Sequence, residues 1–216
     1  MAALSLVVLS GCAHNPQVAA TVAGHDISTH DVDVLTKALC LEQQSSSQGQ
    51  PTSYSALQAS ALSALISTKV DEDYAAKNDL SDNPPSLAAS LKQLDGLIQR
   101  VPSDDRDQAR DLITGLIRGQ LQLQDVVVAQ LQQSGQKPTQ QLVTQGIQQL
   151  ERQHATTLST TVNPRYDTGT TADADGASVS RTVSASAKSA LSVLRGNSTK
   201  TSNAYVASLP TSQRCG

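Results

Sequence analysis

The fold is decided by residues 18–31, which read VAATVAGHDISTHD. The first five residues form a compact apolar run that predicts a short strand, and Gly24 with its polar neighbours predicts a turn. Ile27 continues the extended chain. Ser28 then offers a hydroxyl at the start of a helix, and Asp31 offers a carboxylate three residues later, which resembles a capping box. The stretch therefore predicts a strand, a turn and the start of a helix in close succession.

Apolar residues recur at helical spacing along most of the chain that follows. Prolines, glycines and polar loops divide this pattern into separate helices. The predicted helices begin at Ser28, near residue 54, at Ser86, at Ser103 as the cap of the longest one, and at Lys137-Pro138-Thr139. Asn83-Pro84-Pro85 is expected to stop the chain, and Pro138 to lie in a first helical turn. An extended segment, 160–166, follows the last helix.

The composition favours helices and excludes several kinds of partner. Aromatic residues make up 2% of the chain, with neither Trp nor Phe, so the core must be built from Leu, Val, Ile and Ala. Such residues favour a mostly α fold over a sheet protein. The net charge of −3 gives no electrostatic footprint for nucleic acid. No apolar stretch reaches the roughly 18 residues that a membrane-spanning helix needs.

Residues 1–12 are typical of a bacterial lipoprotein signal. A short apolar run is followed by LSGC, which ends at Cys12 and matches the lipobox. We expect residues 1–11 to be a signal peptide, and a lipid such as palmitate on Cys12 to anchor a polar tether, 12–17, at the extracytoplasmic face of the cell membrane. A chance cysteine in a frayed terminus is the alternative. No Lys or Arg precedes the apolar run, so we expect the true start to lie upstream.

If Cys12 carries a lipid, two cysteines remain, Cys40 and Cys215. In an oxidising exterior they can pair in only one way, so we expect a disulfide between the first helix and the end of the chain. Two unrelated free thiols are the alternative, because the sequence does not set the distance between them.

The stretch Val22-Ala23-Gly24-His25-Asp26-Ile27-Ser28 resembles the V-x-G-x-x-I-[ST] opening of the SurA N-terminal, or PrsA-like, foldase family. The resemblance covers about 18–166, and the ending from Leu209 is similar to that of actinobacterial lipoprotein members. It implies several helices that embrace a client chain. It also implies a small two-stranded β element, in which a return strand within 162–166 pairs with the first strand.

The same resemblance implies a chaperone or foldase whose partners are unfolded or exported polypeptides. Family members that isomerise proline carry a parvulin domain, which needs on the order of a hundred residues. After Leu158 the chain has only the return strand and a polar, low-complexity tail, 167–216, with a docking segment at its end. We therefore expect binding without prolyl isomerase activity. A structural or adaptor lipoprotein that binds one folded partner or the cell wall is the alternative.

No catalytic, cofactor or metal motif stands out. The sequence has no P-loop, no G-x-G-x-x-G and no G-x-S-x-G. His25 and His30 lie among carboxylates, but their spacing fits no known ligand pattern, and capping explains His30 better. The acidic run 71–73 is expected to be a solvated helix face. We therefore expect a protein that is not an enzyme and that holds neither cofactor nor metal.

Binding of clients requires an apolar groove that is open in the free protein. The candidates come from the second and fourth helices and are Leu65, Ile66, Val70, Leu116, Ile117 and Leu121. Ordinary core positions are the alternative for each of them. The fourth and fifth helices are also rich in Gln, which indicates either a solvated face or an adaptable polar rim around an apolar groove.

Overall fold

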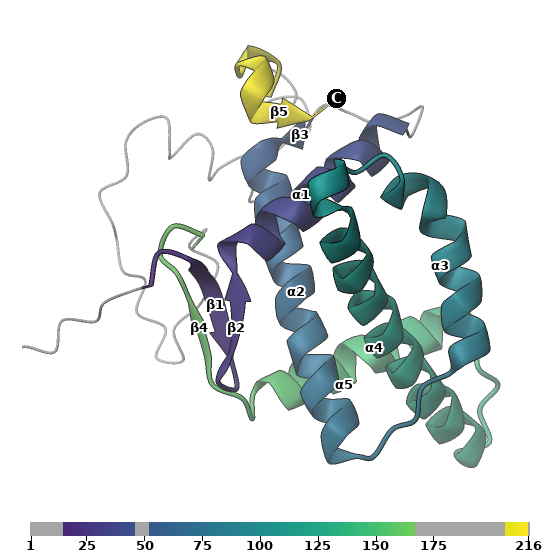
Figure 1. The fold of residues 1–216 in the computed structure, drawn as a ribbon. Helices are drawn as coiled ribbons and strands as arrows, with labels where there is room; N and C mark the ends of the chain where they lie inside the picture. Colours follow the sequence, from purple (N-terminus) through teal and green to yellow (C-terminus); the bar gives the residue numbers. More distant parts are fainter. Residues whose placement is uncertain (1–14, 46–51, 167–205, 216) are drawn as a thin grey trace, which may run out of the picture.

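The computed structural model describes residues 15–45, 52–166 and 206–215, and Figure 1 shows how these parts are arranged. Most of them are helical, and two small antiparallel sheets complete the fold. The predicted mostly α fold class is therefore confirmed. The predicted signal peptide, the lipidated Cys12 and the stretch 167–205 of the predicted tail lie outside the described residues. Among the helices that are described, none is long and apolar enough to cross a bilayer.

A three-stranded sheet joins the start of the chain to the segment after the last helix (Figure 1). β1 (Val18–Val22) lies in its middle, antiparallel to β2 (His25–Ser28) and to β4 (Thr160–Val162). In the second pair Ala20 lies opposite Val162. The expected pairing of the first strand with a return segment is confirmed, but β4 overlaps the expected return strand, 162–166, only at Val162. The strand β2 makes the element one strand larger than expected.

The turn between β1 and β2 has two residues, because Val22 pairs with His25. Both turn residues have positive φ, 50° at Ala23 and 84° at Gly24. Positive φ at both central positions is the geometry of a type I′ turn, whose twist matches that of the flanking strands. The turn signal at Gly24 thus marks a hairpin, which is why the segment after it forms a strand.

The capping box at the start of α1 (Thr29–Ser45) is present. The Ser28 hydroxyl accepts a hydrogen bond from the Asp31 N–H at 3.0 Å, and the Asp31 carboxylate accepts one from the Ser28 N–H at 3.0 Å. The hydroxyl of Ser28 also donates to this carboxylate at 2.7 Å. These bonds satisfy N–H groups that have no partner within the helix, so the hairpin leads directly into α1.

The remaining predicted helices are all present with small differences at their ends. They are α2 (Tyr54–Lys77), α3 (Pro84–Ile98), α4 (Arg106–Gln133) and α5 (Gln140–Ala155). A single 3-10 turn, η1 (Ser103–Asp105), precedes α4. Together with α1 they form a bundle beside the sheet, in which α5 crosses behind α2 and α4 (Figure 1).

The predicted starts of three helices were wrong in detail. Pro84 and Pro85 begin α3 instead of only ending the previous segment, because a first turn does not use their missing N–H groups. Ser103 lies in η1 and makes no capping bond to α4. Thr139 caps α5 through its hydroxyl, so Pro138 precedes the cap and is not in the first turn.

The main core lies where the three-stranded sheet meets α1, α2 and the first half of α4. Its buried members are Ala19, Ala20, Val22, Ile27, Val32, Leu35, Ala61, Leu62, Leu65, Val70, Ile98 and Ile113. They are the aliphatic residues that the composition required. Each large side chain that is fully buried here stabilises the fold by about 1.5–3 kcal/mol. The meeting of the two chain segments in the sheet is therefore held by a continuous aliphatic cluster.

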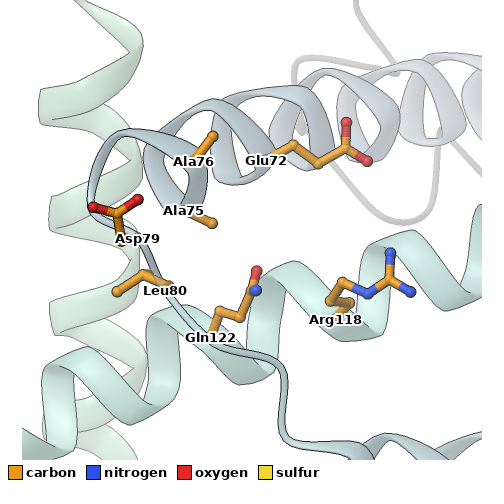
Figure 2. A pocket seen from close by; sticks show the side chains of 7 residues that line it. All are labelled: Glu72, Ala75, Ala76, Asp79, Leu80, Arg118 and Gln122. Atoms are coloured by element: carbon orange, nitrogen blue, oxygen red, sulfur yellow. The ribbon is translucent and has the colours of Figure 1, made fainter.

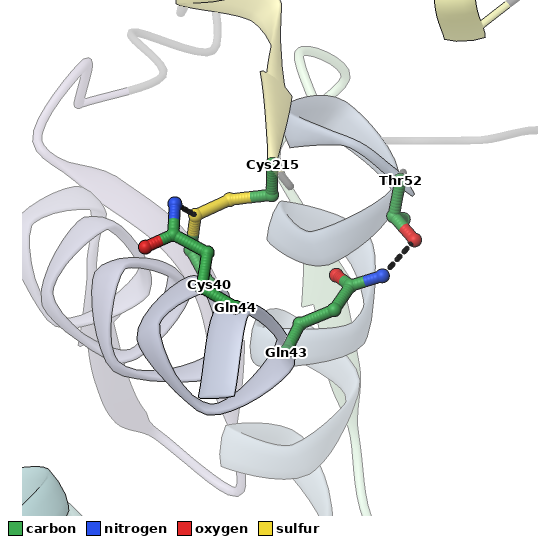
Figure 3. The surroundings of a disulfide bond; sticks show 5 residues. All are labelled: Cys40, Gln43, Gln44, Thr52 and Cys215. Atoms are coloured by element: carbon green, nitrogen blue, oxygen red, sulfur yellow. Dashed lines mark hydrogen bonds between the residues drawn. A yellow bond between two sulfur atoms is a disulfide. The ribbon is translucent and has the colours of Figure 1, made fainter. Parts of the chain in front are cut away.

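The end of the chain lies against the first two helices. β5 (Arg214–Cys215) pairs with β3 (Thr52–Ser53), and a 3-10 turn, η2 (Thr211–Gln213), precedes it. Cys40 and Cys215 form a disulfide, with their Cα atoms 5.6 Å apart (Figure 3). This pairing agrees with the one predicted. It joins α1 to a strand 175 residues later in the chain.

Candidate functional site

The residues predicted to line a groove between α2 and α4 differ in burial. Leu65 and Val70 belong to the main core and are only 5% and 3% exposed. Ile66, Leu116 and Ile117 are half-buried and pack against the same core. The predicted open groove is therefore contradicted at Leu65 and Val70, which the core buries, while binding at the four half-buried positions stays a prediction. Leu121 is half-buried and lies beyond that core.

The less tightly packed part of the molecule is at α5. None of its side chains is fully buried, although one face of the helix carries several aliphatic residues. Gly146 lies on that face, and a Cβ built there would come within 2.5 Å of a methyl of Val127 on α4. The missing side chain therefore lets the two helices approach closely at this one point. Away from it, the aliphatic side chains of α5 are half-buried, except for the exposed Leu142.

We call this region the α4–α5 seam. It consists of Val127 and Leu131 on one face of α4, and of Val143, Gly146, Ile147 and Leu150 on one face of α5. The assignment of faces follows from the contact at Gly146 and from the spacing of three or four residues within each helix. Leu142, beside the seam, is 37% exposed. Only Val127 of this set is fully buried.

Exposed glutamine side chains are frequent on the two helices that form the seam. They are Gln120, Gln124, Gln130, Gln132 and Gln133 on α4, and Gln140, Gln141, Gln145, Gln148, Gln149 and Gln153 on α5. Each amide can both donate and accept hydrogen bonds, and none of them carries a charge. The seam is thus a half-buried aliphatic strip on two helices rich in exposed glutamine, with the carboxyl of Glu151 next to Leu150.

A buried carboxyl lies where α2 meets α4. Asp71 is 6% exposed, and its Oδ1 has no hydrogen-bond partner among the described residues. Opposite it on α4 stands Gly119, where an added Cβ would come within 2.9 Å of the Asp71 Cβ. Burial, followed by repulsion from Glu151 and Glu72, raises the pKa of Asp71 to about 7. Burial also raises the pKa of Glu151, which belongs to α5.

The sequence prediction of a solvated acidic face was wrong at Asp71 and correct at Glu72, which is exposed. Asp71 follows Thr68 at three residues and precedes Ala75 at four, and both of these neighbours are also buried. This spacing places all three on the inward face of α2. The helical period alone could therefore have indicated a buried carboxyl, if the acidic run had been divided by face.

The C-terminal end of α5 is anchored more firmly than its start. His154 Nε2 lies 2.7 Å from Asp73 Oδ2, and its ring meets Tyr74 edge to face at a centroid distance of 5.2 Å. Hydrogen bonds from Lys77 and from His154 lower the pKa of Asp73. Ala155 and Leu158 pack against the main core. The helix is therefore held at its end near β4.

A pocket of about 470 Å³ lies between the C-terminal end of α2 and the middle of α4 (Figure 2). It is lined by Glu72, Ala75, Ala76, Asp79, Leu80, Arg118 and Gln122. Arg118 Nε is 3.4 Å from Asp82 Oδ2, and Gln122 donates to the other oxygen of Asp82 at 3.1 Å. The Arg118 guanidinium in the pocket wall is thus already paired with Asp82. The rest of the lining combines charged with small side chains.

A polar cluster on α1 has a structural explanation. Lys37 Nζ lies 2.6 Å from Asp105 Oδ2 in η1, and this hydrogen bond raises the pKa of Lys37. His30 Nε2 lies 4.0 Å from the other oxygen of Asp105. The cluster thus ties α1 to the start of α4. Within the described ranges, no group of three His, Cys, Asp or Glu side chains could hold a metal ion.

Comparisons with protein-family models, with curated proteins and with solved structures found no match for this chain. Its function must therefore be argued from its own residues. Among these residues, neither the α4–α5 seam nor the buried Asp71 belongs to the main core.

Proposed function

We propose that this protein is a lipid-anchored, extracytoplasmic chaperone-like protein that binds unfolded or exported polypeptides and does not isomerise proline. The single observation that carries the proposal is the α4–α5 seam. An amphipathic helix of 16 residues lies on the fold without one fully buried side chain. Its apolar face is thus only partly covered, and a client segment can contact it.

The chemistry of the seam fits an extended, apolar client segment. Half-buried Leu, Ile and Val residues contact aliphatic side chains of many shapes. The exposed glutamines of the two helices can pair with the free N–H and C=O groups of an unfolded backbone, in either direction. Most exposed polar side chains of the two helices are uncharged glutamines, which do not select one charge pattern in a partner and so favour broad over specific recognition.

The arrangement of the chain also supports the proposal. A first strand and a return strand lie side by side, with a helical bundle between them in sequence, as the resemblance to the SurA N-terminal and PrsA-like foldases implied. The Cys40–Cys215 disulfide is compatible with an oxidising compartment outside the cytoplasm.

Suppression of aggregation tests the binding function. An unfolded client is diluted into buffer with an equimolar amount of the protein, and light scattering is followed over time. We expect suppression by the wild type and a clear loss of it in Ile147→Ser, which places a hydroxyl in the seam. The control is Leu87→Ser, a change at a half-buried leucine of α3 outside the seam.

Three outcomes would contradict the proposal or relocate the site. No suppression by the wild type removes the chaperone function. Equal loss in both variants means that the seam is not the binding site. Capture of one folded partner without protection of unfolded clients supports the structural or adaptor function instead.

The lipid anchor is tested separately. We expect a labelled fatty acid to be incorporated in the producing bacterium and to be lost in Cys12→Ser, with release of the protein from the membrane fraction. Retention of the label in this variant would contradict the proposed lipidation site.

A further inference from the structure

The helix α5 is held firmly at one end only. At its C-terminal end His154 Nε2 lies 2.7 Å from Asp73 Oδ2, and Ala155 packs against the main core. Before the other end and through its first turn, over residues 132–142, every residue is exposed except the half-buried Pro138. The first part of α5 therefore has few buried contacts to break, and it can leave α4 at a lower free energy than the whole fold needs to open.

One close contact closes the α4–α5 seam. A Cβ built on Gly146 would lie 2.5 Å from a methyl carbon of Val127 and 3.4 Å from its Cβ. Val127 is 3% exposed, while Ile147 and Leu150 on α5 are half-buried. The two aliphatic faces thus meet directly at Gly146 and are only partly covered on either side of it.

The loop before α5 is long enough for the first part of the helix to move away. α4 ends at Gln133 and α5 begins at Gln140, which leaves six residues, 134–139, between them. A loop of this length spans at most about 20 Å when it is fully extended. An extended polypeptide with side chains on both faces adds a layer of roughly 10 Å between the two helices. The loop therefore has the reach to admit one such segment while the His154 end stays attached.

We propose that α5 is a hinged clasp: its first part swings away from α4, and a run of consecutive aliphatic residues in a client chain is bound between the two helices. Successive side chains of an extended chain point to opposite faces, so alternate residues of such a run contact the seam residues of α4 and those of α5. A segment with aliphatic residues only at alternate positions fills one of the two faces.

The inference rests on the proposed function, because it names the kind of client that the same site binds. Continuous aliphatic runs form the buried strands of folded proteins, and they become exposed when those proteins unfold. The clasp therefore selects segments that a folded protein hides.

Two peptides of equal composition test the kind of client. Both contain the same aliphatic residues and the same serines between terminal lysines; in one the aliphatic residues are consecutive, and in the other they alternate with serine. We expect the full chain to bind the consecutive peptide about tenfold more tightly in fluorescence anisotropy, because both faces of the clasp are then filled. Equal binding, or tighter binding of the alternating peptide, would overturn the proposal.

A disulfide across the seam tests whether the clasp must open. The 3.4 Å between the Val127 Cβ and a Cβ at Gly146 is close to the separation found in disulfides, about 3.5–4.5 Å. Val127→Cys with Gly146→Cys is therefore oxidised to hold the clasp shut, and peptide mapping confirms the bond. We expect this form to bind the consecutive peptide at least about tenfold more weakly than the wild type, and mild reduction to restore binding.

The wild type under the same reductant is the control, because it also contains the Cys40–Cys215 disulfide. Binding by the oxidised variant that equals binding by the wild type would overturn the proposal.

Gly146→Ala tests the same contact from the opposite side, because the added methyl pushes α5 away from Val127. In hydrogen exchange measured by mass spectrometry, we expect residues 140–151 to lose protection about fivefold, while α1 changes little. The matched control is Gly96→Ala in α3, where nothing lies within 4 Å of the added Cβ, and it should leave α5 unchanged. Unchanged protection of α5 in Gly146→Ala would overturn the hinge.

Failure of the clasp and failure of the proposed function are distinguishable, because the opening of α5 is measured without any client. A lack of aggregation suppression by the wild type removes the proposed function, and with it the client of the clasp. A locked variant that binds as the wild type does removes the clasp and leaves the proposed function in place.

Discussion

The helices α1 and α5 are almost equal in length, with 17 and 16 residues, and they are held in the fold very differently. Five side chains of α1 are fully buried, and the helix is further fixed by a capping box, an ion pair and a disulfide. α5 has no buried side chain and is anchored mainly at one end. The difference indicates that α1 opens only with the whole fold, while α5 can open locally at a lower free energy.

The largest difference should come from matched leucines in the two helices. Leu35→Ala in α1 should lower the free energy of unfolding by about 4 kcal/mol, because it leaves a cavity in a filled core. Leu150→Ala in α5 should lower it by only about 1 kcal/mol, because the site is half open to water. Denaturant unfolding measures both. Equal losses would contradict the distinction between the helices.

Removal of the disulfide should have the next largest effect. The double change Cys40→Ser and Cys215→Ser should lower the free energy of unfolding by about 3 kcal/mol, because it frees a long loop in the unfolded chain. Unfolding with and without a reductant provides the measurement, and the double variant should no longer respond to the reductant. Peptide mapping without reduction that finds both thiols free would contradict the bond itself.

The effect of Asp71 should be smaller and should depend on pH. Its pKa is higher in the folded than in the unfolded state, so folding takes up a proton, and stability falls as the pH rises from about 4 to about 7. Asp71→Asn should therefore gain about 2 kcal/mol at pH 8 and little at pH 4, with relaxation of the site taken into account. Unfolding curves at the two pH values measure this; a gain that is the same at both would point to another cause.

The smallest effect on stability is expected at Leu142. The residue is 37% exposed, so Leu142→Gln should change the free energy of unfolding by less than about 0.5 kcal/mol. It removes an aliphatic side chain beside the seam, so the amount of protein needed to suppress aggregation should rise. A large loss of stability would mean that α5 is packed more firmly than its burial indicates.

The features that the sequence predicted well are local ones. The capping box at Ser28 and the apolar periodicity of the helices depend on neighbours within a few residues, so spacing alone predicts them. The Cys40–Cys215 disulfide was also predictable, because only one pairing is possible once Cys12 is assigned to the lipid. The hairpin strand β2 was predicted only as extended backbone at Ile27, because its four residues carry little apolar alternation and pairing with β1 decides their conformation.

The candidate site was predicted less well, for a physical reason. Apolar residues such as Leu65 in α2 and Leu116 in α4 show that a helix face is apolar, but not whether another helix covers it. Here α2 and α4 cover each other, and the partly open face lies on α5 instead. Gly119 and Gly146 set how closely the helices approach, and their meaning depends on the partners that face them. No pattern within one helix contains that information.

The most direct test of the account compares hydrogen exchange of the full chain with and without an unfolded client polypeptide, at one pH. We predict that the client slows exchange in α5 and in the second half of α4, around Val127 and Leu131, and leaves α1 and the three-stranded sheet nearly unchanged. Protection gained mainly at α1 or at the sheet, or no change in any segment, would contradict the claim that the loosely held helix carries the binding function.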